Sequence, residues 1–208
     1  MTIEKGAAWG SVGPTPHDCV LAKDEAGAAV AVQQGATHVW LESGNILRAL
    51  GLSTATGALH VGEPCRLLPC DVLIVKLDDA APVLALSSVV IGSWRTPQMW
   101  VTTGGFLGAL NVAPRAHVND GLVDALQFNN SIPVRQLLLM RRRMRLGDHL
   151  PHPMLTMHRA AHVNWPSNHQ VAKKRTIRLD GKERGRAAQV TIEVRPDAFS
   201  LCLPMHEA

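Results

Sequence analysis

Polar residues that could bind a ligand or take part in a reaction interrupt one apolar stretch of the chain. The sequence NVAPRAHVNDGLVDALQF places Asn119, Asp120, Gly121 and Asp124 among aliphatic residues. One interpretation is a tight turn, because asparagine, aspartate and glycine accept the backbone angles of turns, followed by a strand in which Asp124 faces solvent. The other is a polar loop in which Asp120 and Asp124 hold Mg²⁺ with the help of backbone carbonyls and waters. We favour the turn and keep the metal site as a hypothesis.

Basic residues form two clusters that could contact an anion. Asp148 is the only acidic residue between positions 131 and 150, and a second cluster runs from Lys173 to Arg186. Such clusters suit a phosphate, an acidic lipid surface or nucleic acid. A helix that buries leucines and exposes solvated arginines explains the first cluster as well, and we prefer that interpretation. The candidate anion or lipid surface in this cluster consists of Arg141, Arg142, Arg143 and Arg145.

The amino-acid composition limits the classes of protein that the chain can represent. The 208 residues are 46% apolar and 18% charged, as expected of one folded domain. The apolar runs fall well short of the ~20 residues that cross a bilayer, and the N-terminus lacks a signal-peptide pattern. We therefore expect a cytoplasmic protein, either free or peripheral to a membrane. Nucleic acid is not an expected partner, because three phenylalanines and no tyrosine offer few stacking platforms, and Trp94 and Trp100 are expected in the core.

Cysteine and histidine spacing gives no evidence of a zinc site. The four cysteines include no C-x-x-C pair, so we expect buried free thiols. His149 and His152, in HLPHP, have no carboxylate at helical spacing. We expect both to be solvated loop residues.

Strand signals dominate the expected secondary structure. We expect short strands within residues 17–43 with a turn at 24–27, a hairpin of 72–77 with 83–91, a strand at 122–128 and a hairpin at Asp180–Gly181. One main helix is expected near 132–146, and NILRALGL could form a single-turn helix. This pattern predicts a mostly β, two-sheet antiparallel sandwich without β-α-β alternation. The chain is expected to be a single domain, 1–208, in which residues 1–70 form an N-terminal β-rich lobe or extension.

The order of several short motifs resembles a known family. GGxxG is followed by APRAHxNDGxxD, a helix ending in RLGDHLPHP, then RLDGKERG and VRPDAFSLCLP. This order resembles the C-terminal β domain of diacylglycerol kinases, sphingosine kinases and bacterial lipid kinases, which is distantly related to the C-terminal domain of NAD kinases. The resemblance covers about residues 71–204 and implies a lipid-kinase-like β-sandwich there.

The chain departs from this family where phosphoryl transfer takes place. The resemblance implies an ATP-binding domain with a Gly-Gly-Asp-Gly-Thr loop, whose glycines let backbone N–H groups approach the phosphates. That loop is absent here. The segment ESGNILRALGL, residues 42–52, is similar to the segment that follows the loop in the family, with one residue fewer between Asn45 and Leu50. We interpret it as a remnant or as a chance match.

The expected catalytic base is also missing. In the family a glutamate follows Leu-Asp-Gly and is thought to act as general base on the lipid hydroxyl. Here Lys182 follows Asp180 and Gly181, and an ammonium group accepts no proton at neutral pH unless its pKa falls by several units. Glu183 would point to the opposite face of the strand. We expect no catalytic residue in this chain.

The resemblance also bears on the polar loop. It implies a structural Mg²⁺ at a D-D-G-x-x-D-like loop, to which Asp120 and Asp124 correspond, whereas the neutral Asn119 replaces the first aspartate. No other cofactor is expected.

Three functional hypotheses follow. The first is a non-catalytic or degenerate lipid kinase-like protein that binds or regulates through a phosphate-bearing or lipid ligand. The second is the lipid-facing half of a split diacylglycerol kinase-type enzyme, completed by a separate nucleotide-binding partner. The third is a module that binds acidic lipid or membrane surfaces. A homodimer remains open in each case.

Overall fold

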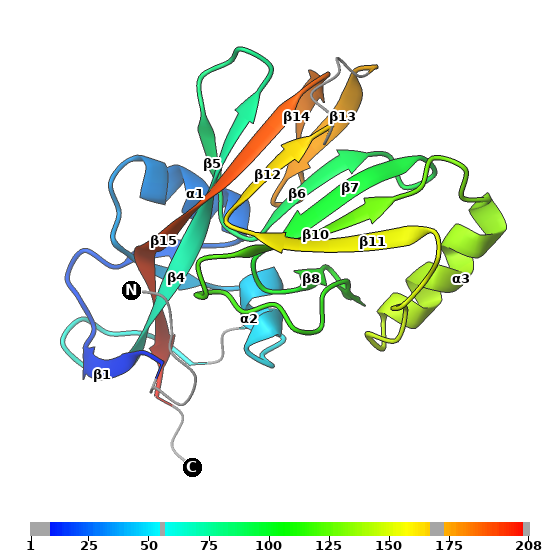
Figure 1. The fold of residues 1–208 in the computed structure, drawn as a ribbon. Coiled ribbons are helices and arrows are strands. Elements are labelled where there is room, and N and C mark those ends of the chain that lie inside the picture. The colour runs from blue at the N-terminus through cyan, green and yellow to red at the C-terminus, as the bar shows by residue number, and fades with distance from the viewer. Residues whose placement is uncertain (1–8, 55–56, 167–172, 206–208) are drawn as a thin grey trace.

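A computed structural model describes residues 9–54, 57–166 and 173–205 of the chain. The N-terminal segment 1–8, included in the signal-peptide expectation, lies outside the described residues. Strands account for 45% and helices for 13% of the structure. Two large sheets dominate the molecule (Figure 1). The predicted mostly β, two-sheet architecture is confirmed.

The first sheet has seven strands, built around one long central pair. β4 and β15 run antiparallel along almost their whole length, with a register shift between Arg195 and Phe199. β3 joins β15 in parallel, and β2 joins β3 in parallel. The strands of this sheet are β1 (Ser11–Pro14), β2 (Val20–Ala22), β3 (His38–Leu41), β4 (Pro64–Leu77), β5 (Val83–Ala85), β12 (His162–Trp165) and β15 (Val190–Pro204).

The second sheet has six antiparallel strands in the order β11-β10-β7-β6-β13-β14. The predicted hairpin at Asp180–Gly181 joins β13 to β14, and both turn residues have positive φ, 47° and 78°. The strands are β6 (Ser88–Gly92), β7 (Pro97–Thr102), β10 (Val123–Phe128), β11 (Leu155–Ala160), β13 (Arg175–Leu179) and β14 (Lys182–Ala187). A small separate hairpin consists of β8 (Phe106–Leu107) and β9 (Leu110–Asn111).

The main core lies between the two sheets. Leu73 and Val75 of β4 belong to the same buried cluster as Val89 and Ile91 of β6 and Val101 of β7. Each such side chain stabilises the fold by about 1.5–3 kcal/mol when buried. Alternate residues of the second sheet point outward, and helix α3 (Val134–Met144) covers them. The predicted main helix is therefore confirmed.

The segment expected to contain a hairpin is instead a β-α-β unit. Helix α1 (Glu25–Gln33) connects β2 to the parallel β3, so the expected turn at 24–27 and the absence of β-α-β alternation were wrong here. The Asp24 side chain caps the helix by accepting a hydrogen bond from the Gly27 N–H at 2.9 Å. The alanine-rich sequence EAGAAVAVQ favours a helix, but its short apolar run has no clear period.

Two further expectations are refined by the structure. NILRALGL contains the short helix α2 (Asn45–Ala49), as expected. The hairpin of 72–77 with 83–91 is only half correct, because β4 pairs with β5 whereas β6 joins the second sheet. The chain therefore crosses between the sheets at residues 86–87. No helix in the described ranges is long and apolar enough to cross a membrane.

Candidate functional site

Lys182, which stands where the lipid kinase resemblance implies a base, lies beside the start of α1. Lys182 begins β14, and its Nζ is 3.1 Å from Oδ2 of Asp24, the N-cap of α1. Glu183 instead pairs with Arg178 at 3.4 Å, in keeping with the alternation of side chains along a strand. The hydrogen bond from Gly27 is the main cause that lowers the pKa of Asp24. The base position therefore carries a cation that is paired with a carboxylate.

A second carboxylate fills the first turn of α1. Glu25 is only 5% exposed, and its Oε1 accepts a hydrogen bond from the Ile46 N–H at 2.8 Å. Burial raises the pKa of Glu25 to about 7. Helix N-termini attract anions, but this one is occupied by the chain's own carboxyl groups. A phosphate placed here would meet negative charge.

Asp180 is a buried structural acceptor, and both of its carboxylate oxygens accept hydrogen bonds. The carboxylate accepts hydrogen bonds from the backbone N–H groups of Leu86, Ser87 and Ser88 at 2.7–2.9 Å. It also accepts one from the Ser87 hydroxyl at 2.9 Å. Burial raises the pKa of Asp180, while these four hydrogen bonds oppose the rise. Asp180 thereby fixes the crossing between the sheets, a role that the sequence did not reveal.

The segment 42–52, which is similar to a segment of the lipid kinases, contacts Ser87 beside Asp180. Its Asn45 donates from Nδ2 to the Ser87 hydroxyl at 3.1 Å and accepts at Oδ1 from the Gly108 N–H at 2.8 Å. Gly44 has φ 153°, and a Cβ there would overlap the Glu25 carboxylate. We call the residues around this contact the Asp180 network: Asp24, Glu25, Asn45, Ser87, Asp180 and Lys182.

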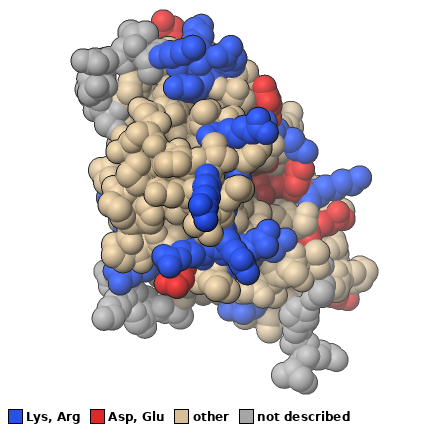
Figure 2. All heavy atoms as spheres, turned by 90° about the vertical axis from the view of Figure 1, so that its right-hand side faces the viewer, with Lys and Arg blue, Asp and Glu red and all other residues tan. Residues whose placement is uncertain are grey.

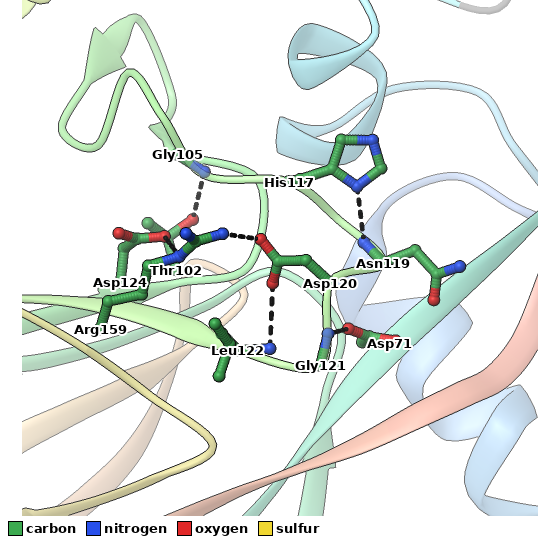
Figure 3. Close-up of polar contacts among 10 residues, drawn as sticks. All are labelled: Asp71, Thr102, Gly105, His117, Asn119, Asp120, Gly121, Leu122, Asp124 and Arg159. Carbon is green, nitrogen blue, oxygen red and sulfur yellow. Dashed lines mark hydrogen bonds and ion pairs between the residues drawn. The ribbon is translucent and has the colours of Figure 1, made fainter. Parts of the chain in front are cut away.

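The second candidate region contains Asp120 and Asp124, and it forms around an arginine (Figure 3). Asp124 on β10 is opposite Arg159 on β11. The Arg159 guanidinium donates to Oδ2 of Asp120, and its Nε lies 4.0 Å from Oδ2 of Asp124. The structure thus brings the two predicted carboxylates together, with a guanidinium between them.

The backbone before Asp124 is a turn. Gly121 has φ 70°, and its N–H donates to Oδ2 of Asp71 at 2.7 Å. Oδ1 of Asp120 accepts from the Leu122 N–H at 3.0 Å. The expectation that Asp124 faces solvent was wrong, because this residue is 5% exposed. Burial raises the pKa of Asp124 to about 6, against the lowering effect of Arg159.

The residues present do not form a good Mg²⁺ site. Within the described residues, no three His, Cys, Asp or Glu side chains are grouped to hold a metal. The Asn119 oxygen is buried without a partner, but its side chain points away from the Asp120 carboxylate (Figure 3). Arg159 supplies the positive charge that a cation would bring. The magnesium hypothesis therefore needs displacement of this guanidinium.

A large cavity of about 1010 Å³ opens beside Asp124 and Arg159. Its lining is mostly apolar, with Arg115, Arg159 and His152 as basic groups. Pockets of this size accept small-molecule or lipid ligands. An amphipathic anion fits this combination of apolar wall and basic groups. The remaining lining residues are Ala113, Pro114, Asp124, Gly147, Leu150, Pro151, Pro153, Leu155, Thr156 and Met157.

The two loop histidines differ in environment. His149 is buried, with Nε2 at 3.1 Å from the Val112 carbonyl oxygen, and burial lowers its pKa. The expectation that it is solvated was wrong. His152 accepts a hydrogen bond at Nδ1 from the Met154 N–H at 3.1 Å and lines the cavity. Sequence spacing could not indicate either contact.

The predicted basic surface divides into two parts. The Arg141 guanidinium stacks on the ring of Trp100, 5.4 Å from the ring centroid, whereas Arg142, Arg143 and Arg145 are exposed. Trp100 is buried as expected. Trp94 is 45% exposed and lies under Arg95, so its expected core position was wrong. All four cysteines are free, and three are buried.

Comparison with known proteins agrees with this architecture. Residues 79–203 match the YegS C-terminal NAD kinase beta sandwich-like domain, and the chain belongs to this family. The match spans most of the region in which the sequence resembles lipid kinases. No curated protein sequence matches the chain.

Solved structures extend the similarity to nearly the whole fold. A diacylglycerol kinase from Bacillus anthracis str. Sterne is 12% identical, with a TM-score of 0.57, over 90% of this chain and 76% of that one. Two further chains from that organism, provisionally described as diacylglycerol kinases, are each 11% identical with TM-scores of 0.58 and 0.59. These cover 89% and 90% of this chain and 77% and 78% of the respective relatives. At such low identity the likeness is one of fold.

Proposed function

We propose that this chain is a non-catalytic lipid kinase-type domain that binds a phosphate-bearing or lipid ligand. The observation that carries the proposal is the ion pair between Lys182 and Asp24. It places a cation where the family has a base and a carboxylate where a helix N-terminus would receive phosphate. The ammonium group cannot accept a proton from an alcohol, and the carboxylate repels an anionic phosphate.

The energetics of phosphoryl transfer support this proposal. Catalysis of this reaction depends on positioned cations and N–H donors around the transferred phosphate. In the Asp180 network the first turn of α1 presents Asp24 and the buried Glu25 instead. We do not assign the role of base to Asp180, because this residue is only 8% exposed and its carboxylate accepts four hydrogen bonds from residues 86–88. Lys182 therefore offers no proton acceptor at this position, and the Asp24 carboxylate beside it is paired with its ammonium group.

The ligand is inferred from the cavity beside Arg159. Its apolar lining suits a hydrocarbon chain, and Arg115 and His152 suit a phosphate or carboxylate, beside Arg159, whose charge is shared with Asp120 and Asp124. This binding role needs neither ATP nor a general base. The proposed binding is therefore compatible with a chain that lacks a phosphate loop and a general base.

The test combines ATP binding with phosphoryl transfer. Purified chain is titrated calorimetrically with MgATP and incubated with labelled ATP and diacylglycerol vesicles, beside an active diacylglycerol kinase. We expect neither binding heat nor labelled lipid. Lys182→Glu restores the family's residue type and serves as the matched variant. We expect it to stay inactive, because Asp24 and Glu25 still repel the triphosphate.

Labelled lipid produced by the wild-type chain, and lost in Lys182→Ala, would overturn the proposal. Activity that arises only when a separate nucleotide-binding protein is added would favour the split-enzyme hypothesis. Ligand binding is tested separately with a fluorescent lysophosphatidic acid. We expect saturable binding that weakens in Arg159→Gln.

A further inference from the structure

Helix α3 presents an outward face that is both apolar and basic. Its buried side consists of Leu137, Met140 and Met144, which recur at the spacing of one helical stripe. Leu138 and Leu139 fall on the other side, and their exposed fractions are 54% and 57%. The expectation that this helix buries its leucines was therefore wrong for Leu138 and Leu139.

The apolar exposure continues past the end of the helix. Leu146 is 83% exposed, the largest value among the exposed large apolar side chains in the described residues, and Val134 at the other end is 47% exposed. Single exposed apolar residues are common on protein surfaces. Four within the thirteen residues from Val134 to Leu146 form a concentrated apolar surface.

The basic residues of this face have no acidic ion-pair partners among the residues that the structure describes. Between positions 131 and 147 the sequence contains no Asp or Glu. None of the ion pairs found in the described ranges involves the arginines at 135, 142, 143 or 145. Figure 2 shows the side of the molecule on which α3 lies, where basic side chains spread over a mostly uncharged surface. We define the α3 face as Val134, Arg135, Leu138, Leu139, Arg142, Arg143, Arg145 and Leu146.

A groove and the large cavity adjoin this face. A groove of about 410 Å³ is lined by Leu139, Arg142, Arg143 and Leu146, among others, and also by His152. His152 lines the larger cavity as well. The α3 face is therefore continuous with the cavity that the proposed function assigns to a lipid ligand.

We propose that the α3 face docks onto the surface of an anionic lipid bilayer. Amphipathic helices bind in the plane of the membrane when leucines insert between headgroups and arginines contact acidic lipids. Long arginine side chains keep their charge at headgroup level while their stems cover apolar surface. Exposed leucines among arginines that have no ion-pair partner in the described residues suit a lipid surface. Exposure to water alone would account for the arginines but not for the leucines.

This inference extends the proposed function by naming its surface and its partner, and it rests on that function only for the lipid class of ligand. Experiments can contradict the proposed function and the docking proposal independently of each other. Phosphoryl transfer would overturn the proposed function and leave docking intact, whereas absence of vesicle binding would overturn docking alone.

Vesicle co-sedimentation tests the proposal. The full chain is mixed with phosphatidylcholine vesicles with and without phosphatidylserine, at low and at high salt. We expect binding that requires phosphatidylserine and weakens with salt. Arg142→Gln/Arg143→Gln is expected to weaken binding about 25-fold, because each arginine contributes about fivefold near an acidic surface.

A matched variant separates the α3 face from net charge. Arg66→Gln/Arg184→Gln removes the same charge from exposed positions on β4 and β14, and we expect at most a twofold change. Leu138→Ser/Leu139→Ser should weaken binding at every salt concentration while the preference for phosphatidylserine persists. All these residues are exposed, so thermal melting should show that the variants remain folded.

Three outcomes would overturn the proposal. These are equal sedimentation of the wild-type chain with neutral vesicles, no sedimentation with any vesicle, and equal binding by both double arginine variants. A fourth outcome would also contradict it: self-association lost in Leu138→Ser/Leu139→Ser without any vesicle binding, which would assign the face to a second copy of the chain.

Discussion

Asp180 accepts two hydrogen bonds from Ser87, one from the backbone N–H at 2.8 Å and one from the hydroxyl at 2.9 Å. These residues are 93 positions apart in the sequence. The contact joins the β13–β14 turn to the segment in which the chain leaves the first sheet for the second. A residue at the family's Leu-Asp-Gly turn therefore has an architectural role here.

Asp180→Asn should destabilise the domain by about 2–4 kcal/mol, because an amide group replaces one acceptor oxygen and faces buried N–H donors. Urea unfolding measures the change. Asp79→Asn, at an exposed position, is the control and should change stability by less than about 0.5 kcal/mol. Equal stability of Asp180→Asn and wild type would remove the architectural role.

Glu25 should make stability depend on pH. Its pKa is about 7 in the folded chain, above the ordinary value of 4.5, so between these values the folded state binds more protons than the unfolded state. Stability therefore falls as pH rises through this window, by up to about 3 kcal/mol. Glu25→Gln keeps an acceptor for the Ile46 N–H and removes this loss.

The measurement compares unfolding of Glu25→Gln and wild type at pH 8 and pH 4. We expect the variant to be more stable at pH 8, and the two proteins to differ little at pH 4. Asp71 and Asp124, whose pKa values burial raises to about 6, contribute a similar slope to both proteins and cancel in the difference. A constant difference across this range would show that Glu25 does not titrate as described.

Arg159 should exclude Mg²⁺ from the pair of carboxylates at Asp120 and Asp124. Calorimetric titration of the wild type is expected to show no Mg²⁺ binding heat. Arg159→Ala removes the guanidinium and should permit weak binding, because two carboxylates and waters can then surround the ion. Asp120→Ala/Arg159→Ala should abolish that binding. Strong Mg²⁺ binding by the wild type would contradict this exclusion and favour a metal site at Asp120 and Asp124.

Gly105→Ala should destabilise the domain by more than about 2 kcal/mol. Gly105 has φ 82°, and an added Cβ would overlap the Ala113 carbonyl oxygen. Gly108 is the matched position, because its φ is also positive, 58°, but an added Cβ meets nothing within 4 Å. Gly108→Ala should cost only about 1 kcal/mol. Similar losses in both variants would contradict the steric argument.

Local patterns predicted some elements and missed others for physical reasons. The Asp180–Gly181 hairpin and α3 were predictable, because turn chemistry and helix stops are local signals. Helix α1 was missed because VLAKDEAGAAVAVQQ combines small apolar residues with no dominant period. The contacts of Asp180 could not be foreseen, since its partners are more than 90 residues away.

The sequence indicated which residues belong to the candidate site better than it indicated the contacts between them. The motifs identified Asp120, Asp124 and Lys182 as positions of interest. The sequence could not show that Arg159 lies between the first two or that Asp24 pairs with the third, because these contacts depend on strand register and on the unexpected α1. The buried side of α3 was misjudged because leucines occur around most of that helix.

Strand β15 has a consequence for how the domain folds and unfolds. It bonds to β4, β3 and β12 at once, and so closes chain loops that span much of the sequence. Such high contact order predicts slow folding. The β2–α1–β3 unit shares this strand with the sandwich and has no separate sheet of its own. Without the unit, Ser200 and Leu201 of β15 would lose their partners on β3.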